Sequence, residues 1–238
     1  TSSALGFFEE EIAGYYGAPQ STYSDEFVWR EGVTGPMGYK LEVMPVHPGF
    51  MAGLASGFGA DHRDQITRLP WTSAALGIMR DGFHEQSPGG YVKLRDDGSP
   101  MLEYPLTDYV LDGARRSLIT QTEMLFAAGA KSVQPRHSGS REYTSLAEAK
   151  REIAKLRFEP LFVTLGSAHI MGGCTMGTDP EQCLVDDRGR YHHLANLHVF
   201  DASVFPTSLG VNPQLTIYGI TARNATRLAE ELTGRAAA

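Results

Sequence analysis

The sequence predicts a fold of the α+β class. Residues 39–43 alternate apolar and polar side chains, which is the period of a half-buried strand. Residues 91–104 place Asp97-Gly98 between two apolar runs, and this dipeptide is a strong short-range signal for a β-hairpin. Two helices with recognisable start signals follow, one after Thr107 and one after Ser145.

Before the hairpin, the predicted elements are few. The first 36 residues are rich in Gly, Ser and aromatic residues, and we predict one short helix there, near residues 7–16. Pro45 and Pro48 close the strand at 39–43. Four glycines in residues 49–60 do not have the spacing of a dinucleotide-binding loop, and no clear strand runs into them. A flexible loop or a small-residue helix face is favoured there over a phosphate site.

After the hairpin, helical signals dominate. Thr107 and Asp108 can cap a helix whose apolar residues recur at helical spacing until Gly129. Residues 130–144 are polar and are predicted to form an exposed loop. Ser145-x-x-Glu148 is a capping box for a second helix, which should run to about Leu156.

The last elements are a strand and a helix. Residues 197–201 are predicted to form the last strand. The last helix should run from Pro213 to about Leu232, with Asn212 as its N-cap. Proline at the first helical position costs nothing, because that N–H would have no partner within the helix.

The overall composition narrows the class of protein. Of the 238 residues, 42% are hydrophobic and 21% charged, as is usual for a globular protein, and no run of 18 apolar residues suggests a membrane span. The net charge of -7 argues against a nucleic-acid-binding surface. Two cysteines, Cys174 and Cys183, do not make a disulfide framework, so a reducing, cytoplasmic location is expected. The chain begins at Thr1 rather than Met, which leaves a preceding targeting segment open.

Most of the eight histidines are expected to have no catalytic role. His192, His193 and His198 lie near Asp186 and Asp187, but their spacing matches no common set of metal ligands. We therefore predict no metal site, and interpret residues 187–189 as a turn.

His169 differs because it lies among small residues, in the run L-G-S-A-H-I-M-G-G-C-T-M-G over residues 165–177. Two further runs follow, N-L-H-V-F-D-A-S-V-F-P over 196–206 and G-V-N-P-Q-L-T-I-Y-G-I-T-A-R-N over 210–224. In this order and spacing, the segments resemble the C-terminal region of the glucose–methanol–choline (GMC) oxidoreductases, and are nearest to the cholesterol oxidase-like branch. The resemblance is most specific over 160–232 and weak before residue 86.

The resemblance implies roles for several residues. His169 matches the family's base, which takes the hydroxyl proton of an alcohol while hydride passes to N5 of FAD. Asn212 matches the residue that binds the substrate oxygen; its alternative role is that of a plain helix cap. The remaining matches are to cofactor-binding positions. Asp201 and Ala202 match the ribityl–diphosphate contacts, and Asn212, Pro213, Gln214 and Thr216 match the turn under the isoalloxazine ring.

The resemblance also implies a domain plan. Residues 1–160 should form a substrate-side domain, an antiparallel sheet flanked by helices. Residues 161–238 should carry the catalytic His and supply the last strand and helix of an FAD-binding domain. The glycine-rich dinucleotide-binding motif of that domain is not in this sequence. An N-terminal FAD-binding half, on the same or another polypeptide, is therefore the expected partner, besides a small-molecule alcohol.

Three functions stay open at this point. The chain is the C-terminal half of an alcohol-oxidising flavoenzyme, a non-catalytic module that binds a small ligand, or a structural subunit that completes a partner's flavin domain. The acceptor of the reduced flavin's electrons is undetermined, oxygen or another compound. An active-site carboxylate is also open, with Glu42, Glu85 and Glu103 as candidates.

Overall fold

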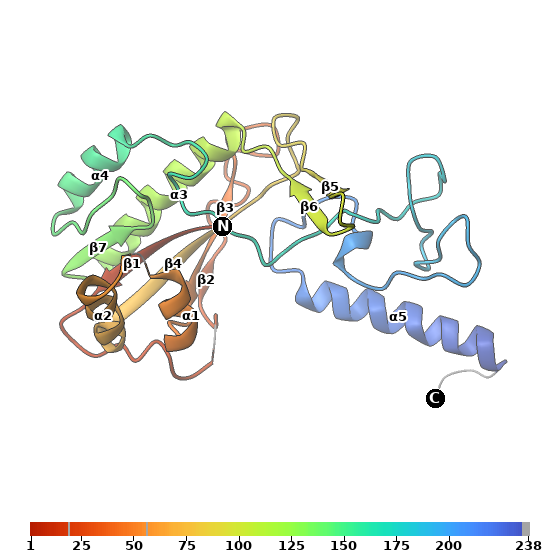
Figure 1. Ribbon diagram of the computed structural model, residues 1–238, viewed down its shortest axis with the longest axis horizontal. Helices are drawn as coiled ribbons and strands as arrows, with labels where there is room; N and C mark the ends of the chain where they lie inside the picture. The colour runs from red at the N-terminus through yellow and green to blue at the C-terminus, as the bar shows by residue number, and fades with distance from the viewer. Residues whose placement is uncertain (19, 56, 235–238) are drawn as a thin grey trace. The chain divides into compact units, whose positions relative to one another are not determined.

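The computed structural model describes residues 1–18, 20–55 and 57–234, and it has mixed α and β structure. The described residues fall into two compact units (Figure 1). Unit 1 comprises residues 1–80 and 106–166, and unit 2 comprises residues 81–105 and 167–238. The prediction of a boundary at residue 160 stays a prediction. The hairpin at 91–104 belongs to unit 2, although it precedes much of unit 1 in the sequence.

Unit 1 is built on a five-stranded antiparallel sheet in the order β2-β3-β4-β1-β7. The two central strands are buried on both faces, so their sequences show no alternation. The strands are β1 (Ser2–Phe7), β2 (Tyr23–Ser24), β3 (Tyr39–Met44), β4 (Thr72–Met79) and β7 (Ser132–Pro135).

Helices α3 (Asp108–Ala127) and α4 (Leu146–Lys155) make the core of unit 1 with one face of the sheet. Leu111, Leu118 and Leu125 of α3 pack with Ala4 of β1 and Ala75 of β4. Both predicted caps are confirmed. The Thr107 hydroxyl accepts from Val110 N, and the Ser145 hydroxyl accepts from Glu148 N.

The opposite face is covered by α1 (Pro48–Leu54), α2 (Ala60–Thr67) and the 3-10 turn η1 (Leu69–Trp71). Met51 and Leu69 pack there against Leu5 and Phe7 of β1. This cover is thin, because Met51 is the only buried residue of α1 and α2 has none. The glycine-containing stretch is thus partly helical; its residue 56 lies outside the described residues.

Unit 2 contains the predicted hairpin, β5 (Tyr91–Leu94) and β6 (Pro100–Glu103), together with η2 (Ala202–Val204) and the long helix α5 (Gln214–Thr233). The hairpin is confirmed, with Val92 opposite Leu102. Most of the rest of unit 2 is irregular and is held by turns and isolated bridges.

Three of the predicted elements were wrong. Residues 8–16 are irregular, with a turn at residues 14–15, rather than helical, because Ile12 N and Ala13 N both donate to Pro70 O. Residues 132–135 of the expected exposed loop form strand β7, which pairs with β1. Residues 197–201 form no strand; His198 makes one isolated bridge to Arg190.

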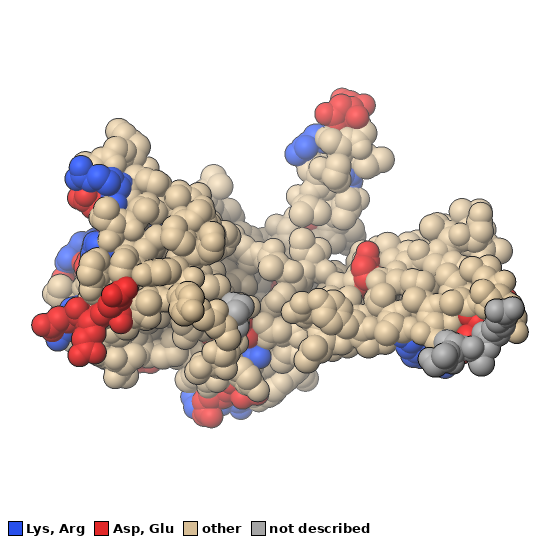
Figure 2. All heavy atoms as spheres, turned by 90° about the horizontal axis from the view of Figure 1, so that it is seen from below, with Lys and Arg blue, Asp and Glu red and all other residues tan. Residues whose placement is uncertain are grey.

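The surface bears no strong basic patch on the face shown in Figure 2, where acidic and basic side chains form small mixed groups between wide uncharged areas. This is in keeping with the net charge of -7. No helix among the described residues is long and apolar enough to cross a membrane.

Candidate active site

His169 lies in an irregular segment of unit 2 and is half-buried. Its backbone N donates to the Ser167 hydroxyl over 3.2 Å, a local bond that shapes the chain just before the imidazole. The residues that follow are fixed to η2: Cys174 N donates to Ser203 O and Met176 N to Val204 O, both over 2.8 Å. The His169 segment is therefore joined to η2 by backbone hydrogen bonds.

Two glycines let this segment adopt its path. Gly172 has a φ of 92°, a conformation that residues with a Cβ rarely adopt. A Cβ at Gly177 would lie 2.3 Å from Cys183 Sγ, so a side chain there would force the two segments apart. Gly172 and Gly177 thus each have a conformational or steric reason to be glycine.

Asp201 and Ala202 lie at the start of η2. The Asp201 carboxylate accepts from Ser203 N over 2.8 Å, so it caps this turn. The Thr221 hydroxyl of α5 donates to Phe200 O over 2.8 Å. Segment 172–177 is therefore hydrogen-bonded to Ser203 and Val204 of η2, and α5 is hydrogen-bonded to Phe200, just before η2. Ser203 and Val204 were not predicted as site-building residues, because their contribution is made by backbone atoms.

Asn212, Pro213, Gln214 and Thr216 lie together at the start of α5. The prediction that Asn212 is the N-cap was wrong by one residue. Pro213 is the N-cap, without a side-chain hydrogen bond, and the helix begins at Gln214. Pro213 O accepts the first intrahelical bond, from Ile217 N over 2.9 Å. Asn212 is half-buried and lies one position before the N-cap residue.

The N–H groups of Gln214, Leu215 and Thr216 precede the first intrahelical bond, and all three residues are exposed. Such groups, with the positive end of the helix dipole, favour an electron-rich acceptor. Because α5 is 20 residues long, the positive end of its dipole is well separated from the negative end at its C-terminus.

The C-terminal half of α5 is anchored by ion pairs. Glu231 pairs with Arg188 over 2.6 Å and with Arg190 over 2.7 Å. Asp186 in turn accepts from Arg188 N and Arg190 N, both over 2.9 Å, which confirms the predicted turn. Gly189 is required in it, since a Cβ there would lie 2.5 Å from Val199 O.

No group of three or more metal-binding side chains occurs within the described residues. His192 is hydrogen-bonded through Nε2 to Gly177 O over 3.0 Å, and His193 packs edge-on against Tyr191. Cys174 and Cys183 are both free thiols.

The three candidate carboxylates differ sharply in burial. Glu42 is 3% exposed and pairs with Lys40 over 3.3 Å within unit 1. Glu85 and Glu103 are exposed. Burial therefore separates Glu42 from the other two candidates.

Comparisons with known proteins agree with the sequence motifs. Residues 86–221 match the family model described as GMC oxidoreductase, in its C-terminal domain. Long-chain-alcohol oxidase FAO4A of Arabidopsis thaliana is 30% identical over 193 residues, which is 76% of this chain and 25% of that protein. A cholesterol oxidase of Acinetobacter baumannii is 43% identical over 65 residues, 27% of this chain and 12% of that protein.

The fold has a counterpart among solved structures. Pyridoxine 4-oxidase from Mesorbium loti superposes with a TM-score of 0.58 at 15% identity, over 96% of this chain and 42% of that one. An uncharacterised GMC-type oxidoreductase of Mycobacterium tuberculosis is 27% identical over 96% of this chain and 34% of its own length. The chain thus spans 25% of the length of the long-chain-alcohol oxidase and 34% of the length of the mycobacterial oxidoreductase.

Proposed function

This chain belongs to the GMC oxidoreductase family, and on that premise we propose that it is the C-terminal half of an FAD-dependent enzyme that oxidises an alcohol to a carbonyl, with His169 as the base. The observation that carries the proposal is the family match over residues 86–221, which includes both His169 and Asn212. Relatives named as long-chain-alcohol and cholesterol oxidases support an alcohol as the substrate.

The residues at the start of α5 fit a flavin. Gln214, Leu215 and Thr216 are exposed residues in the first turn of α5, and their backbone N–H groups precede the first intrahelical hydrogen bond. These donors suit the carbonyl-rich edge of an isoalloxazine ring, and Asp201 and Ala202 would lie toward its ribityl–diphosphate part. When bound, FAD supplies the acceptor for the hydride that leaves the carbinol carbon.

The two polar side chains of the site would divide the work. The His169 imidazole, when neutral, takes the hydroxyl proton of the alcohol at a ring nitrogen near neutral pH. The Asn212 amide has no charge to change, so it hydrogen-bonds the substrate oxygen and orients it. A proton-accepting group and a neutral orienting group are together what alcohol activation requires of the protein.

The surface of α5 supports the existence of a further portion that covers it. Among its described residues only Asn224 is buried, whereas Leu215, Tyr218 and Leu232 are 83%, 59% and 78% exposed. Large apolar side chains left uncovered along one helix mark an interaction surface. We assign this surface to an N-terminal FAD-binding half, on the same or another polypeptide.

The test uses the absorbance between 350 and 480 nm of the protein purified with its N-terminal half, followed by addition of a primary alcohol without oxygen. We expect the absorbance bands of an oxidised flavin, which the alcohol bleaches. A yellow protein that no alcohol bleaches supports the structural-subunit alternative. A colourless protein that does not bind added FAD contradicts the flavoenzyme function and leaves the ligand-binding module.

A further inference from the structure

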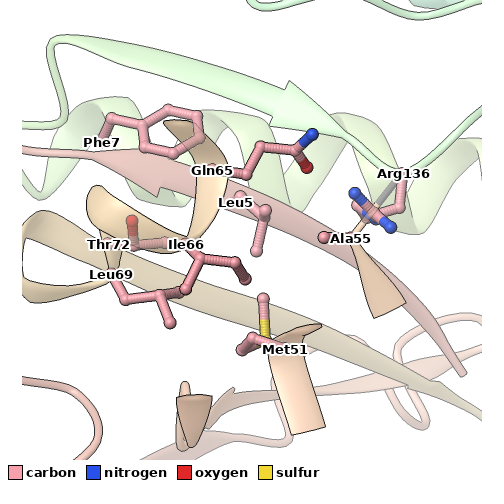
Figure 3. A pocket seen from close by; sticks show the side chains of 9 residues that line it. All are labelled: Leu5, Phe7, Met51, Ala55, Gln65, Ile66, Leu69, Thr72 and Arg136. Atoms are coloured by element: carbon pink, nitrogen blue, oxygen red, sulfur yellow. The ribbon is translucent and has the colours of Figure 1, made fainter. Parts of the chain in front are cut away.

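A small apolar cavity lies in unit 1 between β1 and the cover formed by α1, α2 and η1 (Figure 3). Its volume is about 10 Å³, roughly the space of one water molecule. Most of its lining is hydrocarbon, supplied by Leu5, Phe7, Met51, Ile66 and Leu69. Figure 3 shows Arg136 next to Ala55 at one side of these apolar side chains.

Arg136 is held in place by its backbone. Its N donates to Ser3 O over 3.0 Å, and its O accepts from Thr164 N over 3.1 Å. The guanidinium therefore projects from a fixed point directly after β7. Of its five N–H donors, one is used in a hydrogen bond from Nη2 to Leu54 O, the last carbonyl of α1.

Arg136 has no carboxylate partner within the described part of the chain. The contrast is with Arg68, at the other end of the same apolar cluster, which makes two hydrogen bonds to Glu142 and stacks on Phe7. Burial lowers the pKa of Arg136, because the cation is partly removed from water. A partly desolvated guanidinium with unused donors favours an anion that accepts two of them.

Within the cover over the cavity, helices α1 and α2 are held by few contacts. Neither α1 nor α2 has a side-chain cap, and Met51 is their only buried residue. His62 Nε2 is hydrogen-bonded to Ala52 O over 2.9 Å, which joins α2 to α1, and the Arg136–Leu54 bond holds the end of α1. The η1 part of the cover is held more firmly, by backbone hydrogen bonds from Phe8, Ile12 and Ala13 and by the adjoining Arg68–Glu142 pair. Gly57 and Gly59, both with positive φ, precede α2. An outward shift of α1 and α2 would enlarge the cavity and separate Met51 and Ile66 from the apolar cluster, and a hydrocarbon chain in the enlarged space would restore those contacts.

We propose that this cavity, when α1 and α2 shift outward, binds a small amphipathic carboxylate, such as a medium-chain fatty acid anion. The carboxylate pairs with the Arg136 guanidinium, and the hydrocarbon chain lies along Leu5, Met51 and Leu69. This site lies wholly within unit 1 and does not depend on flavin binding or on alcohol oxidation.

The test is calorimetric titration of the full chain with octanoate, with 1-octanol and with octyltrimethylammonium, which share the chain and differ in the head group. We expect octanoate to bind at least about tenfold more tightly than either of the others, as a charge-assisted pair requires. Arg136→Gln should remove this preference, and Arg136→Lys should retain most of it. Arg141→Gln, which changes an arginine paired with Glu148 away from the cavity, is the matched control.

The alternative is that Arg136 only caps the last carbonyl of α1. In that case octanoate and octanol bind equally, or Arg136→Gln lowers the melting temperature without changing the ratio of their affinities. Either result overturns the proposal. Arg136→Lys, which keeps the charge and can still donate to Leu54 O, keeps the test decisive if Arg136→Gln does not fold.

Discussion

Arg68 and Glu142, 74 residues apart in the sequence, are joined by two hydrogen bonds of 2.8 and 2.9 Å. The same guanidinium lies 3.6 Å above the ring of Phe7, and Glu142 also accepts from the Ser132 hydroxyl. This pair connects the residue before η1 with strands β1 and β7, and so ties the cover of the apolar cavity to the sheet.

The pair predicts a dependence of stability on pH. The Arg68 hydrogen bonds, ahead of the Ser132 bond, hold the pKa of Glu142 below its usual 4.5. A lowered folded-state pKa means that the stabilisation is complete above about 4.5 and is lost as the pH falls through the folded value. Because both side chains are more than a third exposed, the contribution is at most about 1 kcal/mol. Urea unfolding of Glu142→Gln at pH 7 and pH 3 should show a larger loss of unfolding free energy at pH 7 than at pH 3. An equal loss at both values would contradict the assignment. Glu123→Gln, which changes a carboxylate paired with Lys150 on the surface, serves as control.

Gly77 of β4 is predicted to be the least replaceable residue beneath α3. A Cβ there would lie 1.7 Å from the Ser117 hydroxyl and 2.7 Å from Gln121 Nε2, and both residues are fully buried. Gly77→Ala should destabilise the fold by about 1–3 kcal/mol, as overpacking does.

The matched control for Gly77→Ala is Gly53→Ala. Gly53 lies within α1, and a Cβ there would meet nothing within 4 Å. Alanine should therefore be neutral or stabilising by about 0.5–1 kcal/mol. Chemical denaturation of both variants measures the change in the free energy of unfolding. Equal changes for Gly77→Ala and Gly53→Ala would refute the close approach of β4 and α3.

The extent of sequence-based prediction differs between elements for physical reasons. Helices α3 and α4 were predicted to within a residue or two, because their caps and apolar spacing are local. Strands β1 and β4 were not predicted, since both faces are buried and no alternation appears. The polar residues Ser132 and Gln134 predict a loop where strand β7 pairs with β1, so the sequence pattern misses this strand.

The candidate site was predicted through its motifs rather than through its geometry. The order of the segments around His169 and Asn212 indicated the family, and the comparison confirms it. The hydrogen bonds from Cys174 to Ser203 and from Met176 to Val204 could not be predicted, because they join backbone atoms across long stretches of chain. Arg136 gave no signal, since its lack of a carboxylate partner is a property of the folded surroundings.

Asn212 provides a test of function against capping. In the structure the N-cap residue of α5 is Pro213 rather than Asn212, whereas the Ser145 hydroxyl caps α4. Ser145→Ala should cost about 1 kcal/mol of stability. Asn212→Ala should cost less than about 0.5 kcal/mol and lower the turnover of an alcohol by the assembled enzyme. Thermal melts and initial rates separate the two effects. A loss of stability at Asn212 as large as that at Ser145, with turnover unchanged, would restore the plain cap.

The most direct test of the central proposal is the rate at which an alcohol bleaches the flavin of the assembled enzyme without oxygen. His169→Gln should slow this rate by about 10²-fold or more while the oxidised flavin's absorbance stays unchanged. His193→Gln, an exposed histidine of the same unit, should leave it unaltered. Bleaching of the His169→Gln enzyme at the wild-type rate would contradict the assignment of His169 as the base.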